Sequence, residues 1–85
     1  MSCLTVNSTQ NNNVYHMHED RIEVKSGLKL KEIRLPYNMD YLQFHDLYYI
    51  NNKLFAIVAT NKPYDVRYEI DEEKIELTGE PIPTY

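Results

Sequence analysis

The sequence is poor in cysteine and glycine, and each shortage excludes a class of protein. A single cysteine, Cys3, cannot form a disulfide within the chain, which excludes the disulfide-stapled secreted domains. The two glycines, Gly27 and Gly79, do not belong to a phosphate-binding loop. No stretch approaches the ~18 apolar residues of a membrane span, so no membrane partner is expected. With no basic residue before Arg21 and no apolar leader, the cytoplasm is the expected location.

Basic residues are also few, because 9 Lys and Arg face 13 Asp and Glu, for a net charge of -4. Binding to phosphate backbones needs a basic field, so nucleic acid is not an expected partner. The 85 residues suffice for one domain, and a hydrophobic content of 42% is enough for most of the chain to pack.

The alternation of apolar and polar residues predicts an all-β domain over residues 1–85, with at most a small helical contribution. We expect an antiparallel meander of about four to six short strands. Residues 1–20 are expected to be a flexible or loosely paired arm, with strand character at 4–6 and 14–18. A four-stranded meander is predicted over 46–78. Residues 79–85 are expected to be an extended tail, since Pro81 and Pro83 cannot donate to a central ladder.

The meander is predicted from two hairpins. In the first, Asn51-Asn52 joins the apolar segments 47–50 and 54–60, and asparagine tolerates the left-handed conformations of a tight turn. In the second, apolar residues alternate with charged ones on both sides of Glu72-Glu73.

Two segments do not fit a regular strand. Across residues 28–35 the apolar positions change parity, which predicts a bulge at Lys31-Glu32. After Pro36, residues 37–45 have neither strand alternation nor a helix cap, which predicts an irregular segment or one short helical turn.

Residues Leu54 to Ala59 are apolar at every position, which is typical of a strand covered on both faces. The second face could be covered by the N-terminal third of the chain or by a second copy of the protein. A homo-oligomer that forms through an exposed sheet edge or face is therefore one expectation.

Few residues indicate catalysis or metal binding. His16 and His18 would share one face of a strand and could ligate a metal with Glu19, Asp20 or His45, although two exposed histidines on an edge strand explain the pattern more simply. Cys3 has no charged neighbour to activate it, and no Ser-His-Asp arrangement can be assembled. We expect no catalytic site, no bound metal and no cofactor.

Acidic residues concentrate in the second hairpin. Residues 65–80 hold seven Asp and Glu against Arg67 and Lys74. Glu69, Asp71 and Glu76 are predicted to share one strand face and to form an anionic surface. Such a surface could attract a basic partner; the simpler interpretation is a solvated face whose charges protect a sheet edge from aggregation.

Tyrosine is the main aromatic residue, with 8 Tyr, 2 Phe and no Trp. Buried hydroxyls need hydrogen-bond partners, so some of these side chains should lie at a surface. Tyr48, Tyr49 and Tyr64 are candidates for a protein interface, with shielding of the sheet rim as the alternative.

Together these features predict a non-enzymatic module that binds a partner protein. We expect an inhibitor or regulator that occludes a basic site through Glu69, Asp71, Glu76 and the three tyrosines. The alternative is a self-associating assembly subunit, and a third hypothesis is a minor metal-binding role of His16 and His18.

Overall fold

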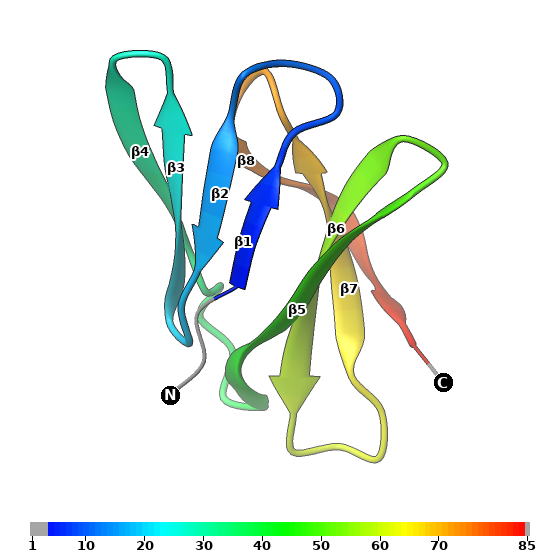
Figure 1. Cartoon of the computed structure of the whole chain (residues 1–85). Helices are drawn as coiled ribbons and strands as arrows, with labels where there is room; N and C mark the ends of the chain where they lie inside the picture. The colour runs from blue at the N-terminus through cyan, green and yellow to red at the C-terminus, as the bar shows by residue number, and fades with distance from the viewer. Residues whose placement is uncertain (1–3, 85) are drawn as a thin grey trace.

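The computed structural model describes residues 4–84, and these form two antiparallel sheets of four strands each. The first sheet has the order β1-β2-β3-β4 and the second the order β5-β6-β7-β8 (Figure 1). The strands are β1 Leu4–Asn7, β2 Val14–Met17, β3 Arg21–Ser26, β4 Lys29–Arg34, β5 Tyr41–Ile50, β6 Lys53–Thr60, β7 Val66–Asp71 and β8 Glu76–Pro83.

The two sheets pack against each other over one hydrophobic core. Side chains from both sheets contribute to it, among them Tyr15 and Ile22 from the first and Phe44, Leu54 and Val58 from the second. The predicted all-β antiparallel domain is confirmed, and it has eight strands rather than four to six. Residues 4–84 contain no helix that could cross a membrane.

The first sheet includes residues that were expected to form an arm. β1 and β2 pair with each other, and β2 pairs with β3, so residues 4–17 belong to the sheet. The predicted bulge at Lys31-Glu32 is wrong, because β4 pairs with β3 in an unbroken register. The apolar residues of this segment change parity because they lie on opposite faces of a regular strand. Ile33 points into the core, whereas Leu30 lies on the opposite face in solvent.

The second sheet begins earlier than the sequence predicts. The expectation of an irregular or helical segment over 37–45 is wrong from Tyr41 onward, because β5 starts there. Its register shifts between Tyr41 and Gln43 and again between Phe44 and Asp46. These two register shifts interrupt the alternation of inward and outward side chains, so the sequence does not show the pattern of a regular strand.

The turns of the second sheet require unusual backbone conformations. Asn51 and Asn52 both have positive φ, at 50° and 65°, as the predicted tight turn demands, so this hairpin is confirmed. Ile75 also has a positive φ of 57°, which is costly for a β-branched residue, yet its side chain is buried. β8 extends through the expected tail to Pro83 and is an edge strand of its sheet.

The apolar strand β6 is buried on both faces. Leu54, Ala56 and Val58 belong to the core that the two sheets share. Phe55 and Ile57 point away from it, but they are only 8% and 6% exposed. Arg67 from β7 lies over the Phe55 ring, with its guanidinium carbon 5.1 Å from the ring centre. Side chains of the same sheet thus help to cover the second face, and the burial of β6 does not require a second copy.

Candidate functional site

The face of the second sheet that points away from the first sheet carries most of the predicted site residues, and we call it the outer face. Two rows of side chains cross it in register. One row is Tyr48, Phe55, Glu69 and Thr78, and the next is Asp46, Ile57, Arg67 and Ile82.

The acidic residues predicted from the sequence lie together on this face. Asp71 pairs with Glu76 across the β7–β8 ladder, and Glu69 precedes Asp71 by two positions on the same side of β7. Tyr48 lies in the same row as Glu69, with Phe55 between them. Arg67 and Lys53 also point to this side, so the carboxylates are interspersed with two cations.

The other two predicted tyrosines lie elsewhere. Tyr49 points toward the core, and its hydroxyl donates to Glu72 Oε1 at 2.8 Å and accepts from the backbone N–H of Thr9 at 3.2 Å. Tyr64 also packs against the core, in the loop that follows β6. These two side chains hold the fold together and are not part of the outer face.

The charges of the two sheet surfaces differ in how they are paired. On the first sheet, Arg21 contacts Asp20 at 2.9 Å and Arg34 contacts Glu32 at 2.7 Å. On the outer face of the second sheet, no ion pair within residues 4–84 involves Glu69, Asp71, Glu76, Lys53 or Arg67. The charges of this face are therefore not neutralised by ion pairs within the described part of the chain.

Arg67 also has a buried hydrogen-bond donor that no described residue satisfies. Its Nε atom is buried and has no hydrogen-bond partner in the described part of the chain. The stacking on Phe55 compensates for part of this cost, since a cation over an aromatic ring gains about 0.5–1 kcal/mol. A buried donor without an acceptor remains unfavourable by about 1–3 kcal/mol.

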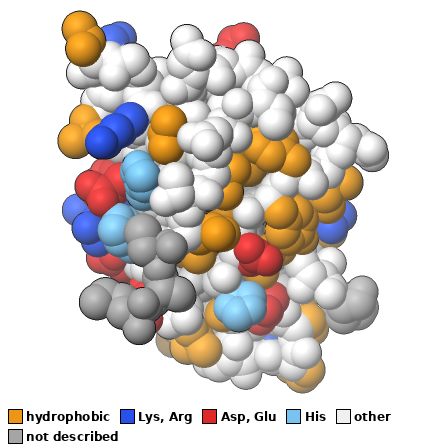
Figure 2. Space-filling model, in the orientation of Figure 1, with side chains coloured by type: hydrophobic (Ala, Val, Ile, Leu, Met, Phe, Trp, Pro, Cys, Tyr) orange, Lys and Arg blue, Asp and Glu red, His pale blue; other side chains and the backbone are white. Residues whose placement is uncertain are grey.

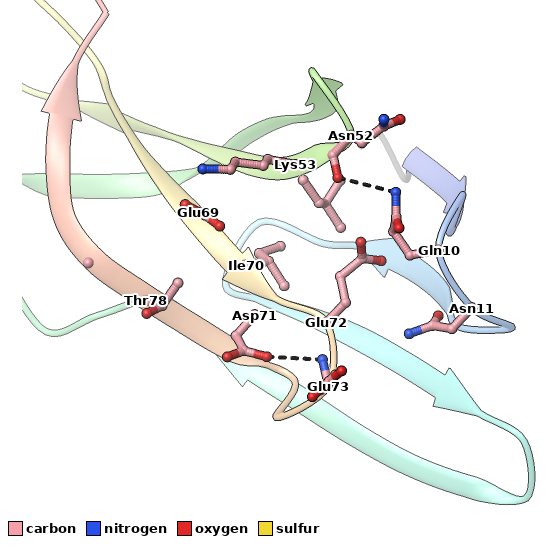
Figure 3. Close-up of a pocket in the computed structure, with 12 residues that line it drawn as sticks. Gln10, Asn11, Asn52, Lys53, Glu69, Ile70, Asp71, Glu72, Glu73 and Thr78 are labelled. Atoms are coloured by element: carbon pink, nitrogen blue, oxygen red, sulfur yellow. Dashed lines mark hydrogen bonds between the residues drawn. The ribbon is translucent and has the colours of Figure 1, made fainter.

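A hollow of about 670 Å³ lies where the outer face meets the turns at one end of the sheet (Figure 3). Its polar lining includes four carboxylates, three side-chain amides and one ammonium group: Glu69, Asp71, Glu72, Glu73, Gln10, Asn11, Asn52 and Lys53. The N-terminal loop closes one side, where Gln10 Nε2 donates to the Asn52 carbonyl oxygen at 3.4 Å. The excess of carboxylates favours a cationic group in this hollow.

Beside the hollow, hydroxyl and amide groups converge on Glu72, and we call Ser8, Asn13, Tyr15, Tyr49 and Glu72 the Glu72 cluster. Glu72 Oε1 accepts hydrogen bonds from the hydroxyls of Ser8 at 2.7 Å, Tyr15 at 3.0 Å and Tyr49 at 2.8 Å. Asn13 Nδ2 donates to the Glu72 carbonyl oxygen at 3.0 Å and to the Tyr15 hydroxyl at 3.1 Å. Burial, with a smaller effect of the Glu72 carboxylate, raises the pKa of Tyr15 well above its ordinary value.

Sequence reasoning missed this cluster, because its members come from both sheets and no local pattern links them. The only signal was the uncharged polar tract at residues 7–13, which looked like an ordinary loop. The structure shows that this tract connects the first sheet to the β7–β8 turn.

Asp71 has a structural task as well as a place on the outer face. Its Oδ1 accepts hydrogen bonds from the backbone N–H groups of Glu73 and Lys74, both at 3.0 Å. The bond from Lys74 is the main cause that lowers the pKa of the Asp71 carboxyl below its ordinary value, and the bond from Glu73 adds to it. The charge of Asp71 thus stabilises the turn that closes the hollow.

The candidate metal ligands do not come together, because His16 lies on β2 of the first sheet with His18, Glu19 and Asp20 directly after that strand, whereas His45 lies on β5 of the second sheet. His18 Nε2 contacts Glu23 Oε1 at 2.6 Å, and His16 Nδ1 is 3.1 Å from the Thr5 hydroxyl. They line a shallow hollow of about 290 Å³ with Lys25 and Leu30. Within residues 4–84 no group of three or more potential ligands is placed to hold a metal ion. Cys3 lies outside the described residues.

Figure 2 shows how side-chain types differ between the sheets on one side of the molecule. Charged and histidine side chains gather over the strands of the first sheet and also lie over the lower part of β5, and hydrophobic side chains reach the surface over β5 and β6. No protein-family model matches the chain, and the searches of curated proteins and of solved structures likewise find no match.

Proposed function

We propose that this protein is a non-enzymatic binding module that recognises a basic segment of a partner protein and, by occupying it, inhibits or regulates the partner. The binding surface is the acidic end of the outer face, where Glu69 and Asp71 line the hollow and Glu76 pairs with Asp71 across the ladder. Tyr48 lies in the same row as Glu69. The cytoplasm is the proposed location of this interaction, in keeping with the unpaired Cys3.

One observation carries this proposal: the carboxylates of this surface form no ion pair within residues 4–84, whereas acidic residues of the first sheet do. Exposed ion pairs are individually weak, so leaving these carboxylates unpaired costs the fold little. A surface on which Glu69 and Lys53 coexist without pairing keeps its charges for another molecule. The hollow adds depth, so that a lysine or arginine side chain could enter between the carboxylates.

The proposal is tested by chemical-shift mapping of the ¹⁵N-labelled protein with a capped hexa-arginine peptide at low salt. We expect shifts of the amides around the hollow, including Asn52, Glu69 and Glu73, and binding that weakens as salt increases. The variant E69Q/D71N/E76Q should bind at least tenfold more weakly. Asn is chosen at position 71 because its side-chain oxygen can still accept the two turn hydrogen bonds.

The matched control is E19Q/D20N/E32Q, which changes the net charge by the same amount on the other side of the molecule. It should bind the peptide as the unchanged protein does. An equal loss in both variants would show that the peptide responds only to overall charge and would reject a specific site.

A further inference from the structure

The hairpin between β3 and β4 carries three of the 9 basic residues of the chain, and we call residues 25–31 the basic hairpin. Lys25 pairs with the residue between Lys29 and Lys31, so it points to one face of the ladder and they point to the other. Leu28 at the apex is fully exposed. Hydrophobic and basic side chains therefore gather over this hairpin, at the upper left of Figure 2.

The carboxylates nearest to the basic hairpin already have partners. Glu23 lies 2.6 Å from His18 Nε2 and 3.8 Å from the Arg21 guanidinium. Glu32 lies 2.7 Å from the Arg34 guanidinium. The three lysines, in contrast, take part in no ion pair within residues 4–84. The basic hairpin is therefore a local excess of positive charge on a chain whose net charge is negative.

The basic hairpin and the acidic hollow lie at the same end of the molecule, the upper end in Figure 1. The Lys31 ammonium group reaches the β7–β8 turn, where it donates to the Lys74 carbonyl oxygen at 3.3 Å. Even so, no ion pair within residues 4–84 joins a lysine of the hairpin to a carboxylate of the hollow. The ladder is continuous up to the pair Ser26 and Lys29, which holds the tip in place. The two opposite charges therefore remain unmatched within one chain.

We infer that the basic hairpin of a second copy enters the acidic hollow, so that self-association competes with partner binding. The inference rests on the proposed function, because it uses the same hollow. The charges are complementary, since the hollow is lined by four carboxylates and one ammonium group. Because both elements lie at one end of the chain, a two-fold arrangement brings each hairpin to the hollow of the other copy. Two small contacts of this kind give a weak, reversible dimer.

An anionic membrane fits the basic hairpin less well than a second copy does. The bond from Lys31 to Lys74 places the hairpin beside the β7–β8 turn, which carries the carboxylates of Glu72 and Glu73. An anionic lipid surface that attracts the lysines repels these carboxylates. A second copy instead brings its own lysines to them.

The inference is tested by sedimentation velocity at protein concentrations from about 10 µM to about 1 mM and at physiological salt. K25E/K29E reverses the charge of the hairpin. E69K/E73K reverses charges of the hollow and leaves the Glu72 cluster intact. We expect the unchanged protein to dimerise, and each variant alone to self-associate at least tenfold more weakly. An equimolar mixture of the two variants should dimerise again, because each then meets the opposite charge on the other.

Two comparisons separate a specific contact from an effect of overall charge. E69K/E73K is closer to neutral than the unchanged protein, so net charge alone predicts stronger association, the opposite of our expectation. K62E changes an exposed lysine in the β6–β7 turn, at the other end of the molecule, and should associate as the unchanged protein does. Equal thermal unfolding midpoints check that each variant keeps the fold.

Three results would overturn the inference: a protein that stays monomeric, association that K25E/K29E does not weaken, or a mixture that fails to dimerise. Binding to phosphatidylserine vesicles that K25E/K29E abolishes would assign the hairpin to a membrane instead. The hexa-arginine peptide should dissociate the dimer, and a dimer that persists with peptide bound would refute the competition.

The proposed function can fail separately. K25E/K29E keeps the hollow unchanged, so it should bind the hexa-arginine peptide at least as strongly as the unchanged protein does. Peptide binding by a protein that stays monomeric would reject this inference alone. A dimer that shows the expected charge exchange but binds no peptide would reject the proposed function alone.

Discussion

Tyr15 donates its hydroxyl hydrogen to Glu72 Oε1 over 3.0 Å, although 57 positions separate the two residues in the chain. The hydrogen bond connects the centre of the first sheet to the turn between β7 and β8. Because that turn closes the candidate hollow, the shape of the hollow depends on how the two sheets are joined.

Glu72→Ala should destabilise the fold by about 2–3 kcal/mol, since it removes the acceptor of three hydroxyl groups. Glu72→Gln keeps one side-chain oxygen and should cost less. Chemical denaturation measures both changes. Glu73→Ala is the control, because Glu73 is exposed and should change the free energy of unfolding by less than about 0.5 kcal/mol. Equal effects at positions 72 and 73 would contradict the role given to the Glu72 cluster.

The fold should lose stability in alkaline solution. Burial raises the pKa of Tyr15 and of Tyr68 well above the ordinary value of 10.0, with the hydrogen bond to Tyr41 a further cause for Tyr68. Since the unfolded chain releases these protons first, the stabilisation is complete below pH 10.0 and is lost as the pH rises above it. Denaturation at increasing pH, with tyrosinate absorbance as a second measurement, checks this. Tyr15→Phe and Tyr68→Phe should each make the free energy of unfolding fall less steeply as the pH rises. An unchanged dependence on pH in both variants would show that these two tyrosines do not cause it.

Acid should weaken the β7–β8 turn. The lowered pKa of Asp71 means that its charge stabilises the folded state above the ordinary carboxyl value of 3.8, and this contribution disappears as the pH falls through the lowered value. A carboxyl-detected NMR titration should give Asp71 a midpoint below 3.8. In Asp71→Asn the turn should persist in acid, because the amide oxygen still accepts from Glu73 and Lys74. A midpoint at or above 3.8 would contradict this reading of the turn.

Arg67→Met should leave the free energy of unfolding unchanged or raise it by up to about 1 kcal/mol. The substitution removes a buried Nε without an acceptor, while the methionine side chain can still cover Phe55. Arg67→Ala should instead lower stability, because it uncovers Phe55 and Ile57. If Met proves as damaging as Ala, the guanidinium itself stabilises the fold.

Ile75→Gly should lower the thermal unfolding midpoint, because the loss of a buried aliphatic side chain costs about 2–5 kcal/mol and exceeds the relief of backbone strain. The change relieves a positive φ that costs an isoleucine about 1–2 kcal/mol, but it also removes a buried side chain from the core. Asparagine also tolerates a positive φ and also lacks the apolar contact, so Ile75→Asn should lose stability in thermal unfolding as well. Greater stability of both variants would show that strain is the larger effect.

The sequence was most informative where structure is set locally. The Asn51-Asn52 turn and the strands around it were predictable, because two asparagines between apolar segments leave few other conformations. β5 was not, since its shifts at Tyr41/Gln43 and Phe44/Asp46 depend on contacts outside the strand, such as the bond from Phe44 N–H to the Glu19 carbonyl oxygen.

The same distinction applies to the candidate site. Alternation along β7 correctly placed Glu69 and Asp71 on one side of the strand. The pairing of β5, β6 and β7 then places Tyr48 in the same row as Glu69. The direction of the Tyr49 side chain could be predicted only once it was known which face of β5 points into the core. The Glu72 cluster depends on the packing of one sheet on the other, which no period in the sequence encodes.

The prolines of β8 make the two outermost strands of the second sheet unequal. Pro81 and Pro83 lack the amide hydrogen that an added strand would need, so a ladder cannot grow past the C-terminal part of β8. β5 carries no proline over its ten residues. Fibril growth or strand exchange that involves this sheet would therefore proceed from β5, which gives any aggregate of the protein a defined polarity.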